Sequence, residues 1–254
     1  MSLKVTFLGT GTSQGVPVIA CACNVCLSGD RRDKRLRTSV FLEADGYNII
    51  IDTGPDFRYQ VLRAGISRLD AILYTHEHRD HIAGLDDVRS FNFKQKMAMP
   101  IYGNHQVIEQ IKREFHYIFE SSYPGIPRLE IHEIQNQGFA VGNLPVLPIR
   151  VMHHKLPVFG FRIHDFTYIT DANYIPEPEF DKVRGTKILV INALQKDDHL
   201  SHFTLNEALE VVDRVMPEKA YFTHISHNLG LHKDIAKELP ANVMLAYDGL
   251  SITL

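Results

Sequence analysis

The segment His76-Glu-His-Arg-Asp-His81 constrains this chain more than any other. Only Thr75 separates it from the apolar run Leu69–Tyr74, which predicts a buried strand. His76 and His78 are two positions apart, so in an extended segment their side chains point to the same side. Four ligand-type side chains in six residues exceed what one tetrahedral ion needs from so short a segment. A solvated polar loop is the alternative, but the position after a buried strand suits a preorganised site for two neighbouring metal ions.

Two ions need ligands from elsewhere, and the second half of the chain offers candidates at the ends of predicted strands. They are His153 or His154 after Leu147–Met152, Asp171 at the end of Phe166–Thr170, and His224 after Lys219–Thr223. One such residue alone would more often be structural. Three of them, in a chain that also carries the histidine segment, indicate that both halves contribute to one metal centre.

The cysteines indicate a second kind of metal site. Cys21, Cys23 and Cys26 are the chain's three cysteines and lie within six positions. An odd number of closely spaced thiols cannot form a disulfide framework and fits a metal site better. A closed structural zinc site has four ligands, so these thiols need one further partner.

The order of the predicted elements favours an α/β fold. Strand patterns first follow one another and later alternate with helix patterns, in both halves. This order predicts two packed sheets with helices outside. No linker or low-complexity segment divides the chain, so we expect one domain over residues 1–254.

Local signals predict several individual elements. Asp45-Gly46 predicts a hairpin between Ser39–Ala44 and Tyr47–Asp52. Asp248-Gly249 predicts another hairpin at the end of the chain. The expected helices are Phe57–Ala64, Ile82–Phe93, His105–Phe119, Leu205–Met216 and Leu231–Leu239.

Composition and charge limit the classes of binding partner that we expect. The chain has 254 residues, 44% of them hydrophobic and 22% charged, which is typical of a globular protein. With 27 Lys+Arg against 30 Asp+Glu, a nucleic-acid-binding surface is not expected, although a local basic patch leaves that partner open. One basic stretch, Arg31–Arg37, is interpreted as a solvated loop, with a phosphate clamp or nucleic-acid contact as the alternative. No targeting segment and no membrane-spanning apolar run is visible, so we expect a cytoplasmic protein without a membrane partner.

The motifs together resemble the metallo-β-lactamase superfamily. The resemblance rests on the histidine segment, preceded by Ile51-Asp-Thr-Gly54 and followed by His153, Asp171 and His224, and it spans essentially the whole chain. It implies a four-layer αβ/βα sandwich. It also implies that His76, His78 and His153 hold a first ion, that Asp80, His81 and His224 hold a second, and that Asp171 bridges them. Asp52 resembles the family's buried aspartate that supports the ligand loop.

The choice of His153 over His154 rests on the same resemblance. Alternation along the strand directs only one of the two side chains toward the metals. The family places its ligand histidine two to four residues before a proline or apolar run that leads to glycine and an aromatic residue. Here that run is Pro157-Val-Phe-Gly-Phe161, which favours His153.

The cysteine cluster resembles one branch of the superfamily, that of the phosphoribosyl cyclic phosphodiesterases of phosphonate breakdown. The branch combines a Cys cluster near position 20 with the ending His224-Ile-Ser-His227. It implies one structural zinc held by Cys21, Cys23, Cys26 and His227, with His232 as the rival fourth ligand. A further histidine of that branch, outside the metal shell, matches His202, with His199 as its competitor.

The resemblance implies an enzyme, a metal-dependent phosphoric diester hydrolase. Two divalent ions, zinc or manganese and alternatively iron, would supply an attacking hydroxide. His202 and Asp80 are the expected catalytic residues, and His202 would give a proton to the leaving oxygen. The expected substrate is a small cyclic or linear phosphodiester, with a phosphoribosyl cyclic phosphate as the sharpest expectation. The resemblance also suggests a homodimer.

Three other functions stay open. A tRNA 3′-end processing endonuclease would share the metal residues, but the long arm rich in glycine and basic residues is not visible in this sequence. A thioester or lactone hydrolase fits the Cys cluster and His202 less well. A non-hydrolytic metal protein of cofactor biosynthesis would not need the full set of seven active-site ligands.

Overall fold

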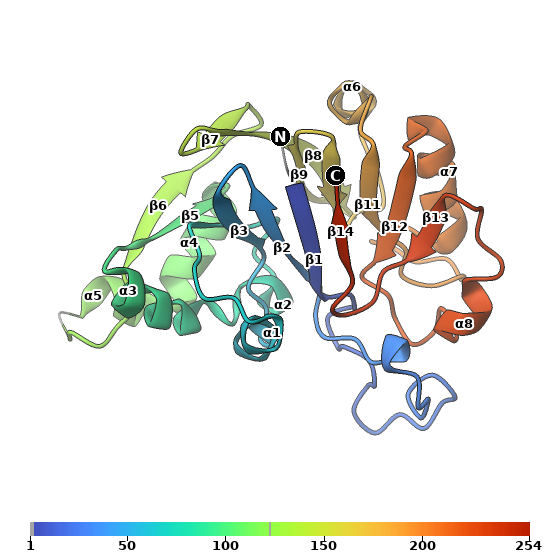
Figure 1. Cartoon of the computed structure of the whole chain (residues 1–254), viewed down its shortest axis with the longest axis horizontal. Helices are drawn as coiled ribbons and strands as arrows, with labels where there is room; N and C mark the ends of the chain where they lie inside the picture. Colours follow the sequence, from blue (N-terminus) through green and yellow to red (C-terminus); the bar gives the residue numbers. More distant parts are fainter. Residues whose placement is uncertain (1–2, 122) are drawn as a thin grey trace. The chain divides into compact units, whose positions relative to one another are not determined.

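The computed structural model describes residues 3–121 and 123–254. The chain forms two compact units. The first unit comprises the described residues of 1–8, 39–135 and 251–254, and the second comprises residues 9–38 and 136–250. Each contains one seven-stranded sheet with its own helices (Figure 1). The single domain expected over residues 1–254 stays a prediction.

The sheet of the first unit is mixed. Its strands, in spatial order, are β14 (Ser251–Thr253), β1 (Leu3–Gly9), β2 (Ser39–Ala44), β3 (Tyr47–Ile51), β4 (Ala71–Leu73), β5 (Met99–Gly103) and β6 (Leu129–Glu133). The predicted β2–β3 hairpin is confirmed, with Asp45 and Gly46 at φ 47° and 87°, as a two-residue primed turn requires. From β3 to β6 the strands run parallel. Their carboxyl ends therefore meet at one edge of this sheet.

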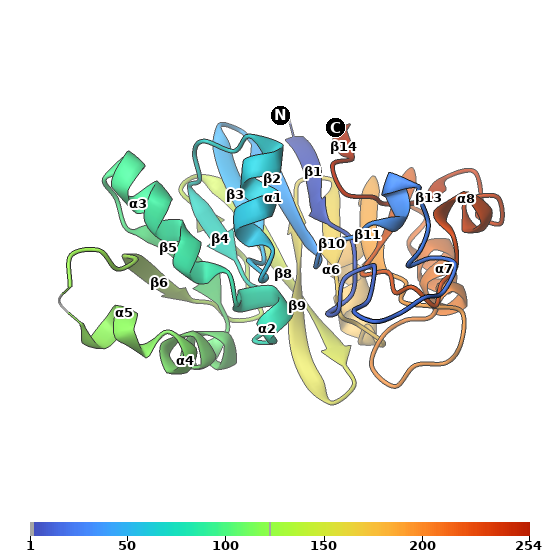
Figure 2. The same cartoon turned by 90° about the horizontal axis from the view of Figure 1, so that it is seen from below.

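The predicted helix Phe57–Ala64 is confirmed in the first unit, whereas the helix predicted over His105–Phe119 is divided into two. They are α1 (Phe57–Ala64), α2 (Arg79–Ile82), η2 (Leu85–Val88), α3 (Arg89–Gln95), α4 (His105–Glu114) and α5 (His116–Glu120). The prediction of one helix over 82–93 is wrong, because the helix is interrupted at Gly84, where the backbone packs closely against Thr53 and Gly54. The Gly84 amide donates to the Thr53 carbonyl at 2.8 Å, and a Cβ at Gly84 would lie 2.2 Å from the Gly54 carbonyl oxygen. In Figure 2, α1 and α3 lie on the same face of the first sheet.

The sheet of the second unit has parallel and antiparallel parts. Its strands, in spatial order, are β13 (Val243–Leu245), β12 (Lys219–Thr223), β11 (Ile188–Asn192), β10 (Phe166–Ile169), β9 (Leu156–Ile163), β8 (Leu144–His153) and β7 (Phe139–Val141). From β10 to β13 neighbours are parallel. Every residue of β11 is buried, as is typical of a central parallel strand.

The helices of the second unit are η1 (Arg31–Asp33), η3 (Glu177–Glu179), α6 (Phe180–Val183), α7 (Leu205–Val215) and α8 (His232–Ile235). The longest, α7, is preceded by its N-cap residue Thr204, which forms a capping box with Glu207. Val211 and Val212 on α7 join the buried cluster that includes Ile191 and Phe222 of the sheet. Among the residues the structure describes, no helix combines the length and the apolar character needed to cross a bilayer.

The predicted hairpin around Asp248-Gly249 is wrong. Instead, β13 pairs in parallel with β12, and β14 pairs antiparallel with β1, so the two segments belong to different sheets. The carboxylate of Asp248 accepts hydrogen bonds from Thr10 Oγ1 at 2.8 Å and from the Leu36 amide at 2.9 Å. These contacts with distant residues hold the turn, so its local sequence does not decide the strand pairing.

Candidate metal centres

The first group of predicted ligands follows β3 and β4 in the first unit. Asp52 lies just past β3 with a left-handed backbone, at φ 65°. Its Oδ1 accepts from the Thr75 amide at 2.9 Å, and its Oδ2 accepts from Thr75 Oγ1 at 2.8 Å and from His81 Nδ1 at 2.7 Å. Burial raises the pKa of Asp52, while the contacts with His81 and Thr75 oppose that rise. The buried aspartate expected to support the ligand loop thus contacts that loop directly.

These hydrogen bonds decide which nitrogen of each ring can bind a metal. Thr75 gives its only hydroxyl proton to Asp52, so its oxygen accepts from Nδ1 of His76, 3.0 Å away. His81 likewise donates its Nδ1 proton to the Asp52 carboxylate. In both rings Nε2 therefore carries the lone pair that coordination requires.

The ligand atoms of this group lie at distances that suit metal binding. Nε2 of His76 is 2.9 Å from Nδ1 of His78, and two nitrogen ligands of one tetrahedral zinc lie about 3.3 Å apart. Asp80 brings Oδ2 to 3.3 Å from Nε2 of His81. The rings of His76 and His81 have centroids 4.1 Å apart. Imidazole and carboxylate donors at this spacing fit zinc, manganese or iron.

The second group lies in the second unit, at the carboxyl ends of β8, β10 and β12 and in the loop before α7. Its members are His153, Asp171, His202 and His224. They are 8%, 2%, 9% and 1% exposed, respectively, which is unusual for side chains that could otherwise be solvated. Asp171 contacts two of the rings. Its Oδ1 is 3.1 Å from Nε2 of His224, and its Oδ2 is 3.5 Å from Nε2 of His202.

The backbone at Asp171 is held in a conformation that non-glycine residues adopt at a cost. Asp171 and His224 have φ of 57° and 55°, in the left-handed region. Asn192, at the end of β11, accepts from the Ala172 amide at 2.8 Å and donates to its carbonyl at 3.0 Å. Thr170 Oγ1 donates to Asp171 Oδ1 at 2.8 Å. The residues around Asp171 thus fix both its backbone and its carboxylate.

The structure distinguishes His153 from His154. His153 ends β8 and donates from Nδ1 to the Ser201 carbonyl at 2.8 Å, so its Nε2 carries the lone pair. Its ring lies 4.6 Å from that of His202. His154 is exposed in the following turn, where its backbone amide donates to Asn173 Oδ1. The residue favoured by the sequence is the one that lies in this group.

His202 lies between the other two histidines of the group. Its ring stacks on that of His224, with centroids 4.8 Å apart. Burial lowers the pKa of His202 to about 4, although the contact with Asp171 works in the opposite direction.

The third group is the cysteine cluster, which lies wholly in the second unit. Nδ1 of His227 is 3.3, 3.4 and 3.6 Å from the Sγ atoms of Cys21, Cys23 and Cys26. In a tetrahedral zinc site, a sulfur and a nitrogen ligand lie about 3.5 Å apart. A bond from the Cys26 amide and the contact with His227 lower the pKa of Cys23 to about 6, whereas burial raises that of Cys26 to about 11. Three thiols and one imidazole with this spacing fit a structural zinc ion.

The rival fourth ligand has another partner. Nδ1 of His232 lies 3.2 Å from Nη2 of Arg35, which donates to it. Arg35 is buried and also donates to Thr10 Oγ1 and to the Ala246 carbonyl. The interpretation of the basic stretch as a solvated loop is therefore wrong for Arg35, whose guanidinium is used to hold the fold.

Sequence reasoning missed several polar residues that orient the predicted ones. Thr75 and Thr170 directly precede His76 and Asp171, so their position beside a ligand was a usable signal. Ser201 and Asn192 are distant in sequence from the residues they hold. No local pattern could have identified those two.

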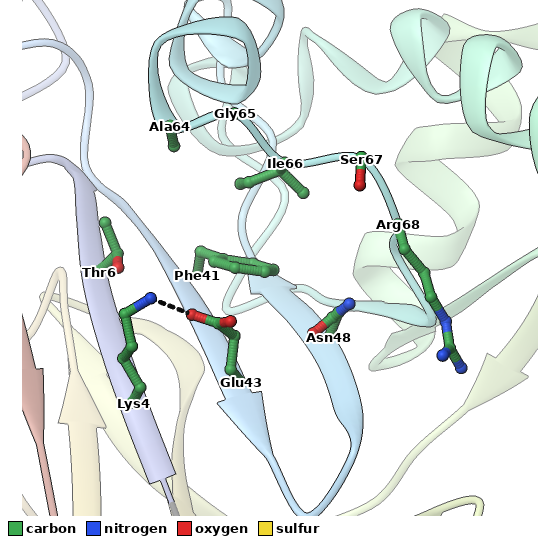
Figure 3. A pocket seen from close by; sticks show the side chains of 10 residues that line it. All are labelled: Lys4, Thr6, Phe41, Glu43, Asn48, Ala64, Gly65, Ile66, Ser67 and Arg68. Carbon is green, nitrogen blue, oxygen red and sulfur yellow. Dashed lines mark hydrogen bonds and ion pairs between the residues drawn. The ribbon is translucent and has the colours of Figure 1, made fainter.

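A polar pocket elsewhere in the first unit contains none of the predicted site residues (Figure 3). It has a volume of about 180 Å³ and lies among β1, β2, β3 and the end of α1. Lys4 Nζ contacts Glu43 Oε2 at 2.6 Å, and Arg68 pairs with Asp70. Because its charged groups neutralise one another, this pocket has no evident role in metal chemistry.

Comparison with known proteins matches the family described as "Beta-lactamase superfamily domain" to residues 47–225. A crystal structure of "a New Diphosphatase from the PhnP Family" covers 100% of this chain and 98% of its own, with 39% identity and a TM-score of 0.94.

Two relatives are considerably longer than this chain. An octanoyltransferase of Porphyromonas gingivalis is 39% identical over 252 residues, which make up 98% of this chain and 51% of the relative. A ribonuclease Z of Bradyrhizobium diazoefficiens is 30% identical over 161 residues, 62% of this chain and 48% of the relative. The chain therefore spans about half the length of the octanoyltransferase relative.

Proposed function

Because this chain belongs to the beta-lactamase superfamily and is similar to a diphosphatase of the PhnP family, we propose that it is a metallo-hydrolase that hydrolyses small phosphodiesters with two divalent ions. The membership confirms the resemblance and the α/β fold of the metallo-β-lactamase type predicted from the sequence. In this proposal the two active-site ligand groups, one from each unit, form one centre. His76, His78 and His153 hold one ion, Asp80, His81 and His224 hold the other, and Asp171 bridges them.

The observation that carries the proposal is the setting of Asp171. Its two carboxylate oxygens face different histidine nitrogens, 3.1 and 3.5 Å away. A carboxylate that presents its two oxygens in different directions is suited to bridge two cations. Its buried position and its left-handed backbone hold that geometry in place.

Each side chain of the centre has a separable task. Bound divalent ions supply Lewis acidity and a nucleophilic water at neutral pH. Asp52 and Thr75 orient His76 and His81, and the Ser201 carbonyl orients His153. His202 places Nε2 beside Asp171, and in its doubly protonated form it would donate the Nε2 proton to the departing oxygen and return to the neutral ring. Cys21, Cys23, Cys26 and His227 would hold one structural zinc, which is coupled to folding.

The names of the longer relatives are not carried over to this chain. The octanoyltransferase and the ribonuclease Z each contain about as much chain again outside the match. The phosphodiesterase proposal needs only residues that this chain contains.

The experiment that tests the proposal combines metal analysis with a substrate screen. Purified protein is analysed for zinc, manganese and iron, and is then assayed on a sugar cyclic phosphate, an alkyl diester and a linear diphosphate. Pre-tRNA, a thioester and a lactone are included as the competing classes. We expect about three divalent ions per chain, by count of the proposed sites, and turnover of phosphorus esters that is lost on chelation and restored by metal.

The rival functions predict other results. Turnover restricted to thioesters or lactones would contradict the proposal, as would metal-loaded protein that hydrolyses none of these compounds. Cleavage of pre-tRNA without turnover of any small diester would favour the endonuclease.

A further inference from the structure

The Nδ1 side of His202 faces a second histidine in the same loop. Nδ1 of His202 and Nδ1 of His199 are 3.2 Å apart, and the ring centroids are 5.0 Å apart. Backbone bonds between Leu194 and Phe203 (3.0 Å) and between Leu205 and Gln195 (2.8 Å) close the loop at its base. The pair is therefore held by the fold, although His199 itself is exposed and His202 is buried.

One backbone amide decides the direction of that hydrogen bond. The Ser201 N–H donates to Nδ1 of His199 at 3.4 Å. A backbone N–H can only donate, so Nδ1 of His199 carries a lone pair. In the pair with His202, the proton therefore lies on Nδ1 of His202, and Nε2 of His202 is the ring nitrogen that faces Asp171, 3.5 Å away.

The same short loop also orients a proposed metal ligand. Ser201 accepts the Nδ1 proton of His153 through its carbonyl oxygen, and its hydroxyl lies 3.1 Å from Nδ1 of His202. Residues 199–202 thus set the orientation of two rings of the second ligand group. A change at His199 is expected to reach the centre through His202.

We propose that His199 is a positioning residue for the hydrolysis, because it accepts the Nδ1 proton of His202 and thereby keeps Nε2 of His202 directed at the leaving oxygen. In the Ser-His-Asp triad a carboxylate holds a catalytic imidazole in the same way, whereas here the acceptor is a neutral ring. The inference rests on the proposed function, because His199 can affect the reaction in this way only if His202 acts as an acid.

Two substitutions separate hydrogen bonding from ring packing. His199→Phe keeps a ring of similar size but removes the acceptor, and His199→Asn keeps an oxygen near the Nδ1 position. We expect H199F to lower kcat on an alkyl diester about tenfold, the worth of one hydrogen bond to a charged ring. KM and the rate on a nitrophenyl diester should change little, and H199N should restore most of the loss. If the ring matters only for packing, H199F is active and H199N is impaired, which overturns the proposal.

Controls keep this result distinct from the proposed function. His105→Phe changes an exposed histidine of the first unit and should leave both rates unaltered. In a His202→Ala background, H199F should cause no further loss. If H202A itself shows no preference for the alkyl substrate, the acid role of His202 fails and the His199 proposal fails with it. If H202A behaves as an acid variant while H199F is fully active on the alkyl diester, only the His199 proposal is overturned.

A measurement on the unsubstituted protein tests the proposed hydrogen bond without an activity assay. Ring 15N chemical shifts in the full chain should place the proton of neutral His202 on Nδ1 and that of His199 on Nε2. The opposite assignment for the pair would overturn the proposal even if both variants fail to fold.

Discussion

The carboxylate of Asp52 accepts a hydrogen bond from Nδ1 of His81 at 2.7 Å, and both side chains are 0% exposed. Such a partner fixes the tautomer and the direction of a metal-binding imidazole, and its loss typically costs 10–100-fold in metal affinity. Asp52 is therefore as much a part of the proposed centre as the ligands, although it is not one of them.

The first prediction concerns that contact. Asp52→Asn can place an amide N–H against Nδ1 of His81, which moves the ring proton to Nε2 and blocks coordination. We expect metal affinity to fall about 10–100-fold, measured by competition with a chromophoric chelator. Asp45→Asn, in the exposed β2–β3 turn, is the control. Unaltered affinity in the Asp52 variant would mean that this hydrogen bond does not orient a ligand.

The second prediction concerns Asp171. If its carboxylate bridges two ions, Asp171→Asn should lower both metal content and turnover, because a neutral amide is a poorer ligand and leaves the positive charge uncompensated. Elemental analysis and steady-state rates measure both effects. Asp165→Asn removes a half-buried carboxylate paired with Lys187 in the same unit and should leave both unchanged. Full metal content with a near-normal rate in the Asp171 variant contradicts the bridging role.

The third prediction separates the cysteine centre from the active site. Cys23→Ser should remove about one zinc per chain and lower the melting temperature, because structural zinc binding contributes directly to folding. The active-site ions should still bind when metal is added. Equal zinc content and an unchanged melting temperature would mean that the thiols are not ligands.

The fourth prediction tests His202 as an acid. An alkoxide needs a proton as the P–O bond breaks, whereas nitrophenolate leaves readily without one. His202→Ala should therefore reduce the rate on an alkyl or sugar cyclic diester about 10²–10⁴-fold and barely affect a nitrophenyl diester, with normal metal content. An equal loss on both substrates would indicate substrate positioning. Loss of metal would make His202 a ligand.

The fifth prediction is a pH dependence of stability. Burial, followed by the charge of Arg35, lowers the pKa of His232 to about 4. Between about pH 6.5 and pH 4 the unfolded chain therefore binds a proton that the folded chain does not. The free energy of unfolding is therefore highest above pH 6.5, where His232 is neutral in both states. It decreases as the pH falls toward 4, by about 1.4 kcal/mol for each unit by which the pKa of His232 is lowered.

Urea unfolding at pH 7.5 and pH 5 measures that loss. His232→Asn keeps an acceptor for Arg35 but cannot become charged, so the free energy of unfolding should change less between the two pH values than in the wild type. The same pH dependence in both proteins would assign the effect to other groups, such as the cysteine centre.

Elements determined by neighbouring residues are predictable from this sequence. Asp45-Gly46 sets the β2–β3 hairpin, and Thr204 caps α7, because their signals lie within a few residues. The hairpin predicted at Asp248 failed because two different sheets each pair with one of its strands. The helix expected over 231–239 is restricted to His232–Ile235, and β7 was not foreseen.

The sequence positions of the candidate ligands could be predicted, because these residues follow apolar strands. The orientation of their side chains could not. The ring of His153 is fixed by Ser201, 48 positions away in the sequence. Asn192 fixes the backbone after Asp171 from the neighbouring strand, 20 positions away. Contacts of this kind depend on how the strands pair, so only the folded chain reveals which nitrogen of each histidine is available.

Asp52, Asp171 and His224 all have left-handed backbones, with φ of 65°, 57° and 55°. Each such residue costs about 1–2 kcal/mol relative to ordinary conformations, and glycine would adopt the same backbone without that cost. Glycine at these positions would relieve that backbone cost but would also remove buried side chains that form hydrogen bonds, as the Asp52 carboxylate does with Thr75 and His81. The strain at these positions is therefore retained for the sake of the side chains, so a screen for heat-resistant variants of this protein has to measure turnover as well as stability.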